Sequence, residues 1–127
     1  MKVFLAGASG VVGHRLAVLL RRAGHQVTGT TRSKDKIAAL QESGVVPVVV
    51  DAYDAERLKQ AVRAAQPDVI IHQLTDLPDQ YDPNTIQAGL EANARLRIDG
   101  TRNLVAAALA AGVTRMIAQS IAFAYAP

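Results

Sequence analysis

The chain contains no cysteine and no tryptophan, and aromatic residues make up only 4% of its 127 residues. Without cysteine it can form no disulfide bond and no cysteine-ligated metal site. This composition is typical of a reducing compartment, so we expect a cytoplasmic protein. No apolar run approaches the length of a membrane span, and the apolar start at 1–5 is soon followed by glycines. We therefore expect no signal peptide and no membrane partner.

The chain also lacks a block of charge of one sign. The net charge is +3, but the 14 lysines and arginines are scattered among 11 acidic residues. Such mixing is typical of a solvated surface, whereas a nucleic-acid-binding face needs clustered basic residues. No group of histidines and acids has the spacing of metal ligands. We therefore expect neither a nucleic-acid partner nor a metal site.

The core has to be built from aliphatic residues. Hydrophobic residues make up 50% of the chain while aromatics are rare, so Val, Ile, Leu and Ala must fill the interior. That is the composition of a parallel sheet covered by helices. The length fits a single domain over 1–127.

Runs rich in β-branched residues alternate with amphipathic segments. The runs predict strands at 3–6, 26–31, 45–50, 69–72 and 116–120. The segments between them predict helices at 12–23, at 33–42 with Ser33 as the cap, at 54–65 with Asp54 as the cap, and over 83–111. With right-handed crossovers, this alternation predicts a doubly wound α/β fold. The expected strand order is 3-2-1-4-5, with helices on both faces of the sheet.

The last connection is unusually long, because residues 73–114 separate the fourth and fifth predicted strands. Asp82 and Pro83 are expected to cap and to start its helix. Gly100 lies inside that helix, where a glycine costs about 1 kcal/mol relative to alanine. Two explanations stay open, namely close packing against the sheet or a cofactor, and a simple kink between two helices.

Three glycines follow the first predicted strand directly and open the first helix. In that context Gly7 allows a tight turn, Gly10 lets the backbone approach a pyrophosphate, and Gly13 lets helix and strand pack closely. The free N–H groups of the helix N-terminus favour phosphate. The turn therefore predicts a Rossmann-type site for NAD(P)H, and the alternative is a structural turn without a ligand. The residues predicted to contact the dinucleotide here are Gly7, Ser9, Gly10, Val11, Val12 and Gly13.

The spacing Gly-x-x-Gly-x-x-Gly over 7–13 resembles the fingerprint of the extended short-chain dehydrogenases/reductases, the NAD(P)-dependent epimerase/dehydratase family. Further similarities follow in order along the whole chain. They are Gly24 and His25 before the second strand, Asp51 after the third, 68–72 as the fourth strand, 100–104 in the long helix and 115–120 as the fifth strand.

The resemblance implies roles for residues at two further strand ends. Asp51 would accept a hydrogen bond from the adenine amine, with Ala52 beside it. His72, Gln73 and Leu74 would lie beside the cofactor crevice. Considered without the family, Asp51 is equally well a strand-ending turn residue, and a histidine at position 72 is more often a satisfied structural residue than a base.

The end of the second strand bears on the choice of cofactor. NAD-preferring enzymes place an acid there, which binds the ribose hydroxyls, whereas this chain has Thr30-Thr31-Arg32-Ser33. Because Arg32 can pair with a 2′-phosphate, we favour NADP over NAD. The alternative is an arginine that stacks on adenine and accepts both cofactors.

The family's catalytic residues are matched only in part. The resemblance implies a Ser or Thr after the fifth strand, for which Ser120 is the candidate. Aligning Tyr125 with the family's tyrosine would instead put Ile121 there. The family's Tyr-x-x-x-Lys pair has no match, since none of the 3 tyrosines is followed by lysine at that spacing. Arg97 also occupies the place where the family usually has an asparagine before Gly-Thr.

These features predict the N-terminal, cofactor-binding part of a longer enzyme. The expected function is that of an epimerase/dehydratase-like oxidoreductase, which transfers hydride to or from a small or sugar-like substrate. The alternative is a non-catalytic, redox-sensing dinucleotide-binding module. We also expect a homo-oligomer, because the uncharged, apolar run at 116–123 would form an exposed edge strand. The alternative is that the tail at 123–127 folds back over this edge and blocks it.

Overall fold

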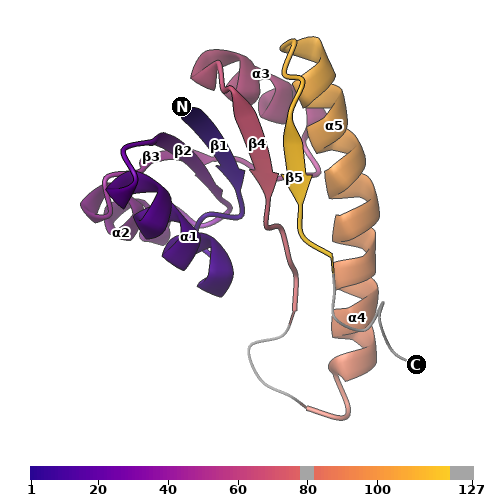
Figure 1. Ribbon diagram of the computed structural model, residues 1–127. Coiled ribbons are helices and arrows are strands. Elements are labelled where there is room, and N and C mark those ends of the chain that lie inside the picture. Colours follow the sequence, from indigo (N-terminus) through magenta and orange to yellow (C-terminus); the bar gives the residue numbers. More distant parts are fainter. Residues whose placement is uncertain (78–81, 121–127) are drawn as a thin grey trace.

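The computed structural model describes residues 1–77 and 82–120, in which five parallel strands form one sheet in the order β3-β2-β1-β4-β5 (Figure 1). The strands are β1 (Lys2–Ala6), β2 (Gln26–Thr31), β3 (Val46–Val49), β4 (Val69–His72) and β5 (Met116–Ala118). The predicted doubly wound α/β fold and its strand order are confirmed. β3 is one residue shorter at each end than predicted, and β5 ends at Ala118.

Helical segments connect these strands. They are α1 (Val11–Arg22), the 3-10 turn η1 (Lys34–Lys36), α2 (Ile37–Glu42), α3 (Ala55–Ala65), α4 (Ile86–Arg95), the π-helical turn η2 (Leu96–Gly100) and α5 (Thr101–Ala110). The predicted cap of α3 is confirmed, since the side chain of Asp54 accepts a hydrogen bond from the Arg57 N–H at 3.1 Å. Ser33 occupies the predicted N-cap position, before η1, but its hydroxyl makes no capping hydrogen bond; its N–H donates to Thr31 Oγ1 at 3.1 Å.

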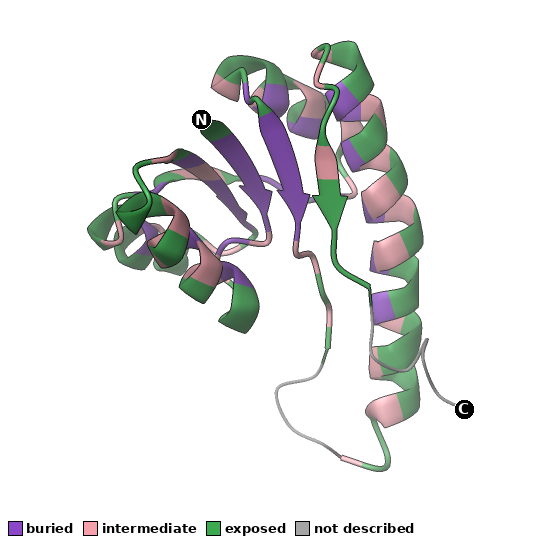
Figure 2. Cartoon of the chain, in the orientation of Figure 1, coloured by how far each residue is buried: buried purple, intermediate pink, exposed green. Residues whose placement is uncertain are grey.

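Two hydrophobic cores lie on opposite faces of the sheet. Alternate residues of β1 separate them, since successive side chains of a strand point to opposite faces. Val3 and Leu5 pack with α1 and α2, whereas Phe4 and Ala6 pack with α3 and α5. Figure 2 shows β4 buried along its whole length, as expected for a strand with helices on both sides. This sandwich leaves the carboxyl edge of the strands open for loops.

The connection between β4 and β5 contains one long helix, in which α4, η2 and α5 are continuous over 86–110. Figure 1 shows that it runs beside β5 and that α4 projects beyond the carboxyl ends of the strands. The helix begins three residues later than predicted. Asp82 forms a turn before it, because its Oδ1 accepts a hydrogen bond from the Asn84 N–H at 2.9 Å.

Gly100 lies buried at the end of the π-helical turn. A Cβ placed on it would lie 3.1 Å from Leu96 Cδ1 and 3.5 Å from the Cβ of Ala52, which follows β3. The contact with Ala52 is an ordinary van der Waals distance, whereas Leu96 would have to shift by a few tenths of an ångström. The helix continues through Gly100 without a break, so the position favours close packing over a kink between two helices.

Candidate functional site

The glycine turn joins the end of β1 to the start of α1. Gly7 has φ +86°, a left-handed conformation that side chains disfavour, and a Cβ there would lie 2.6 Å from the carbonyl oxygen of Gln73. A Cβ on Gly13 would overlap the carbonyl oxygen of Gly7. Both glycines are therefore required by contacts within the protein.

Gly10 differs from the other two glycines. It has φ −76° and ψ 170°, which any residue adopts. The atom nearest to a Cβ added at Gly10 would be the carbonyl oxygen of Gly7, at 3.5 Å. Neither the backbone conformation nor the surrounding protein demands glycine at this position. The absence of a side chain here instead keeps space open in front of the N-terminus of α1.

Thr30, near the end of β2, fixes the turn in place. Its Oγ1 accepts a hydrogen bond from the Gly7 N–H at 2.9 Å, and its carbonyl accepts one from the Ala8 N–H at 3.1 Å. Gly29 allows the close approach, because a Cβ there would lie 2.5 Å from the Ala8 Cβ. The turn is thus attached to two neighbouring strands.

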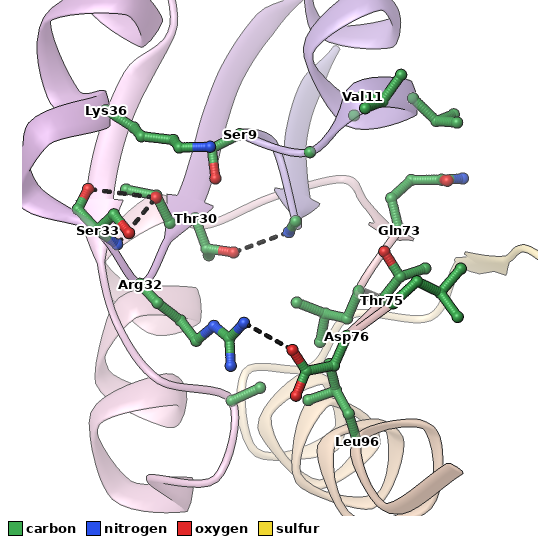
Figure 3. A pocket seen from close by; sticks show the side chains of 18 of the residues that line it. Ser9, Val11, Thr30, Arg32, Ser33, Lys36, Gln73, Thr75, Asp76 and Leu96 are labelled. Atoms are coloured by element: carbon green, nitrogen blue, oxygen red, sulfur yellow. Dashed lines mark hydrogen bonds and ion pairs between the residues drawn. The ribbon is translucent and has the colours of Figure 1, made fainter. Parts of the chain in front are cut away.

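A cavity of about 590 Å³ lies at the carboxyl edge of the sheet, between this turn, the residues after β2 and the residues after β4 (Figure 3). Its volume is in the range typical of small-molecule sites. The predicted site residues that line it are Gly7, Ser9, Gly10, Val11, Val12, Gly13, Arg32, Ala52, Gln73 and Leu74. The sequence pattern thus identifies residues that the fold brings together from four separate segments.

The end of β2 brings two basic side chains to the cavity. Arg32 and Lys36 both line it, and Lys36 extends from η1 on the same side (Figure 3). Arg32 Nη2 forms an ion pair with Asp76 Oδ1 at 3.1 Å. In the described part of the chain Lys36 has no ion-pair partner. Positive charge therefore exceeds negative charge at this end of the cavity.

Gln73 and Leu74 line the cavity after β4, but His72 does not. The imidazole of His72 is buried and points to α5, where Nε2 lies 2.7 Å from Thr101 Oγ1. Its Nδ1 accepts a hydrogen bond from the Leu74 N–H at 3.2 Å. Burial and, to a smaller extent, the positive charge of Arg97 lower the pKa of His72 below 6.5. His72 is therefore placed as a neutral residue that joins β4 to α5.

The two predicted residues after β3 lie in different surroundings. Ala52 is buried and lines the cavity, whereas Asp51 is exposed outside it. Asp51 Oδ1 accepts a hydrogen bond from the Tyr53 N–H at 2.9 Å, the contact of a turn residue. The side chain of Asn103 donates to the carbonyl oxygen of Ala52 at 2.9 Å, which ties this loop to α5.

The residues after β5 form the last wall of the site. Gln119 lines the cavity, and Arg97 Nη2 donates a hydrogen bond to its carbonyl oxygen. The predicted catalytic residue, Ser120, is exposed and does not line the cavity. Ile121 and Tyr125, which enter the alternative alignment of this segment, lie outside the described residues.

Several lining residues were not predicted from the sequence. Lys36 follows Arg32 by four residues, and this spacing is the signal that could have identified it. Asp76 and Leu96 lie in a loop and a π-helical turn whose geometry no sequence pattern indicates. The lining residues missed include Thr30, Ser33, Lys36, Asp76, Leu96 and Gln119.

Over residues 1–77 and 82–120, no helix is both long and apolar enough to cross a membrane.

Two kinds of relative resemble this chain. It is 47% identical over 127 residues to a 3-diazoavenalumate denitrifying reductase from Streptomyces sp, and the match covers 100% of this chain and 40% of that protein. The chain thus spans two fifths of the length of this relative. Among solved structures, ChuY, an anaerobillin reductase from Escherichia coli O157:H7, has a TM-score of 0.72 and 28% identity. That match covers 93% of this chain and 50% of the other.

A UDP-glucose-4-epimerase from Stenotrophomonas maltophila, solved with bound NAD, has a TM-score of 0.79 over 98% of this chain and 38% of its own. At 22% identity this likeness shows the shared fold. The sequence pattern of the NAD(P)H-binding family matches residues 7–127. The predicted resemblance to the NAD(P)-dependent epimerases and dehydratases is confirmed, and the chain belongs to the NAD(P)H-binding family.

Proposed function

We propose that this chain is the NADP(H)-binding part of a reductase that acts on a small molecule. The observation that supports this best is a single cavity bounded by the glycine turn on one side and by Arg32 and Lys36 on another. A dinucleotide phosphate has anionic groups at two separate places, the pyrophosphate and the 2′-phosphate. The cavity offers a group of anion-binding residues for each.

The pyrophosphate is assigned to the turn and to the N-terminus of α1. Gly10 caps this helix without a side-chain hydrogen bond, so the N–H groups of the first turn are left for a ligand. Neither the backbone conformation nor the packing at position 10 requires a glycine. A phosphate close to the backbone accounts for the missing side chain, and the residues present therefore fit the cofactor of the family.

The 2′-phosphate is assigned to the residues after β2. Arg32 can form charge-assisted hydrogen bonds, Lys36 adds a second positive charge, and Ser33 lines the same wall. The acid that would bind the ribose hydroxyls of NAD at this strand end is replaced by Arg32. This arrangement favours NADP(H) over NAD(H).

The adenine end and the reactive end follow from the remaining walls. Ala52 and Leu96 give an apolar surface on which adenine can pack, and Asp51 positions this loop through Tyr53. Gln73 and Gln119 line the cavity from the ends of β4 and β5, next to the segment of Ser120. When bound, the cofactor supplies a hydride. The reductase relative that matches the whole chain supports oxidoreduction as the reaction class.

Calorimetry with NADPH and NADH tests this proposal. We expect tighter binding of NADPH, and we expect Arg32→Ala to weaken it by about tenfold, corresponding to roughly 1.4 kcal/mol for a charge-assisted contact. Lys36→Ala should weaken NADPH binding to a smaller extent. The matched control is Lys34→Ala, because Lys34 lies in the same turn but outside the cavity.

NADH binding should change little in these variants. Equal losses for both cofactors in Arg32→Ala would favour adenine stacking by Arg32 and overturn the 2′-phosphate assignment. Absence of binding by either cofactor would overturn the dinucleotide assignment itself.

A further inference from the structure

The ion pair between Arg32 and Asp76 crosses the cavity. Arg32 follows β2 and Asp76 lies in the loop after β4, so the two side chains approach each other from opposite walls (Figure 3). The distance between Arg32 Nη2 and Asp76 Oδ1 is 3.1 Å. Both residues line the cavity. Among the described residues that line it, Asp76 is the only acidic one.

The backbone at Asp76 is fixed from another element. Its N–H donates a hydrogen bond to Oδ1 of Asn93 at 3.0 Å, and Asn93 is a buried residue of α4. The Asp76 side chain is 33% exposed, compared with 53% for Arg32. The carboxylate therefore belongs to a positioned loop, which presents it to the guanidinium across the cavity.

The carboxylate of Asp76 competes with a 2′-phosphate for the guanidinium of Arg32. Arginine pairs with carboxylates and phosphates through the same planar set of N–H donors. A 2′-phosphate that binds Arg32 must displace Asp76 or share the guanidinium with it, and it also meets the negative charge of Asp76. A ribose with a free 2′-hydroxyl carries no such charge and can leave the ion pair intact.

We propose that Asp76 is a specificity-determining residue, which reduces the preference of the site for NADP(H) over NAD(H) by neutralising Arg32. This inference rests on the proposed function, because it assumes that the 2′-phosphate lies beside Arg32. Asp76 thereby makes the site more tolerant of NAD(H) than its two basic side chains alone would be.

Calorimetry with NADP⁺ and NAD⁺ on folded variants tests the inference. We expect Asp76→Asn to tighten NADP⁺ binding by about three- to fivefold, the size expected for a partly exposed ion pair, and to change NAD⁺ binding by less than about twofold. Asp76→Ala should act in the same direction, and it removes the amide oxygen with which asparagine could still accept a hydrogen bond from Arg32. In an Arg32→Ala background, Asp76→Asn should improve NADP⁺ binding less, because only the direct repulsion between Asp76 and the phosphate remains to be removed.

The matched control is Asp35→Asn, which removes the same charge from η1 but outside the cavity, and it should leave the ratio of affinities unchanged. An unchanged ratio in both Asp76 variants, or an equal gain in the Arg32→Ala background, would overturn the role of Asp76. If Arg32→Ala still weakens NADP⁺ selectively in that case, the proposed function stands. If Arg32→Ala has no selective effect, the 2′-phosphate assignment and this inference both fail.

Discussion

The imidazole of His72 donates a hydrogen bond to the hydroxyl of Thr101, with Nε2 and Oγ1 2.7 Å apart. The direction follows from the other ring nitrogen. The Leu74 N–H can only donate, so Nδ1 accepts and the proton of the neutral ring is on Nε2. This hydrogen bond thereby attaches β4, which ends at the cavity, to α5, which packs against the sheet.

The buried environment of His72 predicts that the stability of the fold depends on pH. Burial and Arg97 lower the pKa of His72 in the folded protein, so between that pKa and 6.5 the unfolded chain binds more protons. The free energy of unfolding should therefore be highest above pH 6.5 and fall as the pH is lowered through this window. Urea unfolding at several pH values measures it.

The variant His72→Gln should lose this part of the pH dependence and be less stable by about 1–3 kcal/mol at neutral pH. The same substitution at His14 is the control. If His72→Gln keeps the pH slope of the original chain, then His72 is not the group responsible.

A second prediction separates the two roles of glycine in the turn. Gly10→Val should leave the chain folded, because among the described residues nothing lies closer than 3.5 Å to an added Cβ, but it should weaken NADPH binding by at least about tenfold. Gly13→Ala should destabilise the fold by about 1–3 kcal/mol, because the new methyl group overlaps the Gly7 carbonyl. Circular dichroism and calorimetry on both variants measure the two effects. Normal NADPH affinity in a folded Gly10→Val variant would contradict the assignment of the pyrophosphate.

A third prediction concerns the attachment of the turn to β2. Thr30→Val keeps the shape of the side chain but removes the acceptor of the Gly7 N–H, which should cost about 1–3 kcal/mol of stability and weaken NADPH binding. The control is Thr28→Val in the same strand, whose side chain has no hydrogen bond in the described part of the chain. Equal effects of the two substitutions on stability and on affinity would show that the hydrogen bond to Gly7 has no special role.

A fourth prediction concerns self-association through β5. Within the described residues this strand pairs with β4 alone, and Ile117 is 58% exposed, so its free edge can pair with a second chain. We expect oligomers in light scattering at high concentration, and Ile117→Lys should reduce them. Leu109→Lys adds the same charge on the exposed face of α5. A monomer at every concentration would refute the edge argument, and an effect of Leu109→Lys alone would assign the contact to the helix.

Much of the fold is predictable because local and global signals agree. Val3, Phe4 and Leu5 read as a buried strand from composition, and the three glycines at its end specify the turn into a helix. The order of the strands then follows from general rules for parallel sheets. Helix starts were less predictable, since the Ser33 hydroxyl makes no capping hydrogen bond and the Asp82 side chain forms a turn before α4.

The site was predictable where it depends on backbone conformation and less so where it depends on side-chain direction. Sequence order cannot distinguish Asp51 from Ala52, although only Ala52 faces the cavity. His72 lies at the expected strand end, but its ring points away from the cavity to α5, where it pairs with the Thr101 hydroxyl. Asp76 was missed because it acts across the cavity on a residue distant in sequence.

The π-helical turn of Leu96–Gly100 sets the rotational phase between the two halves of the long helix. Such a turn contains one residue more than an α-helical turn, as an insertion would leave it. The wider turn takes up the extra residue, so α4 and α5 keep nearly the phase of one continuous α-helix. Asn93 therefore faces the Asp76 N–H while α5 stays packed on the sheet. An extra residue at this one place thus leaves the wall of the cavity intact.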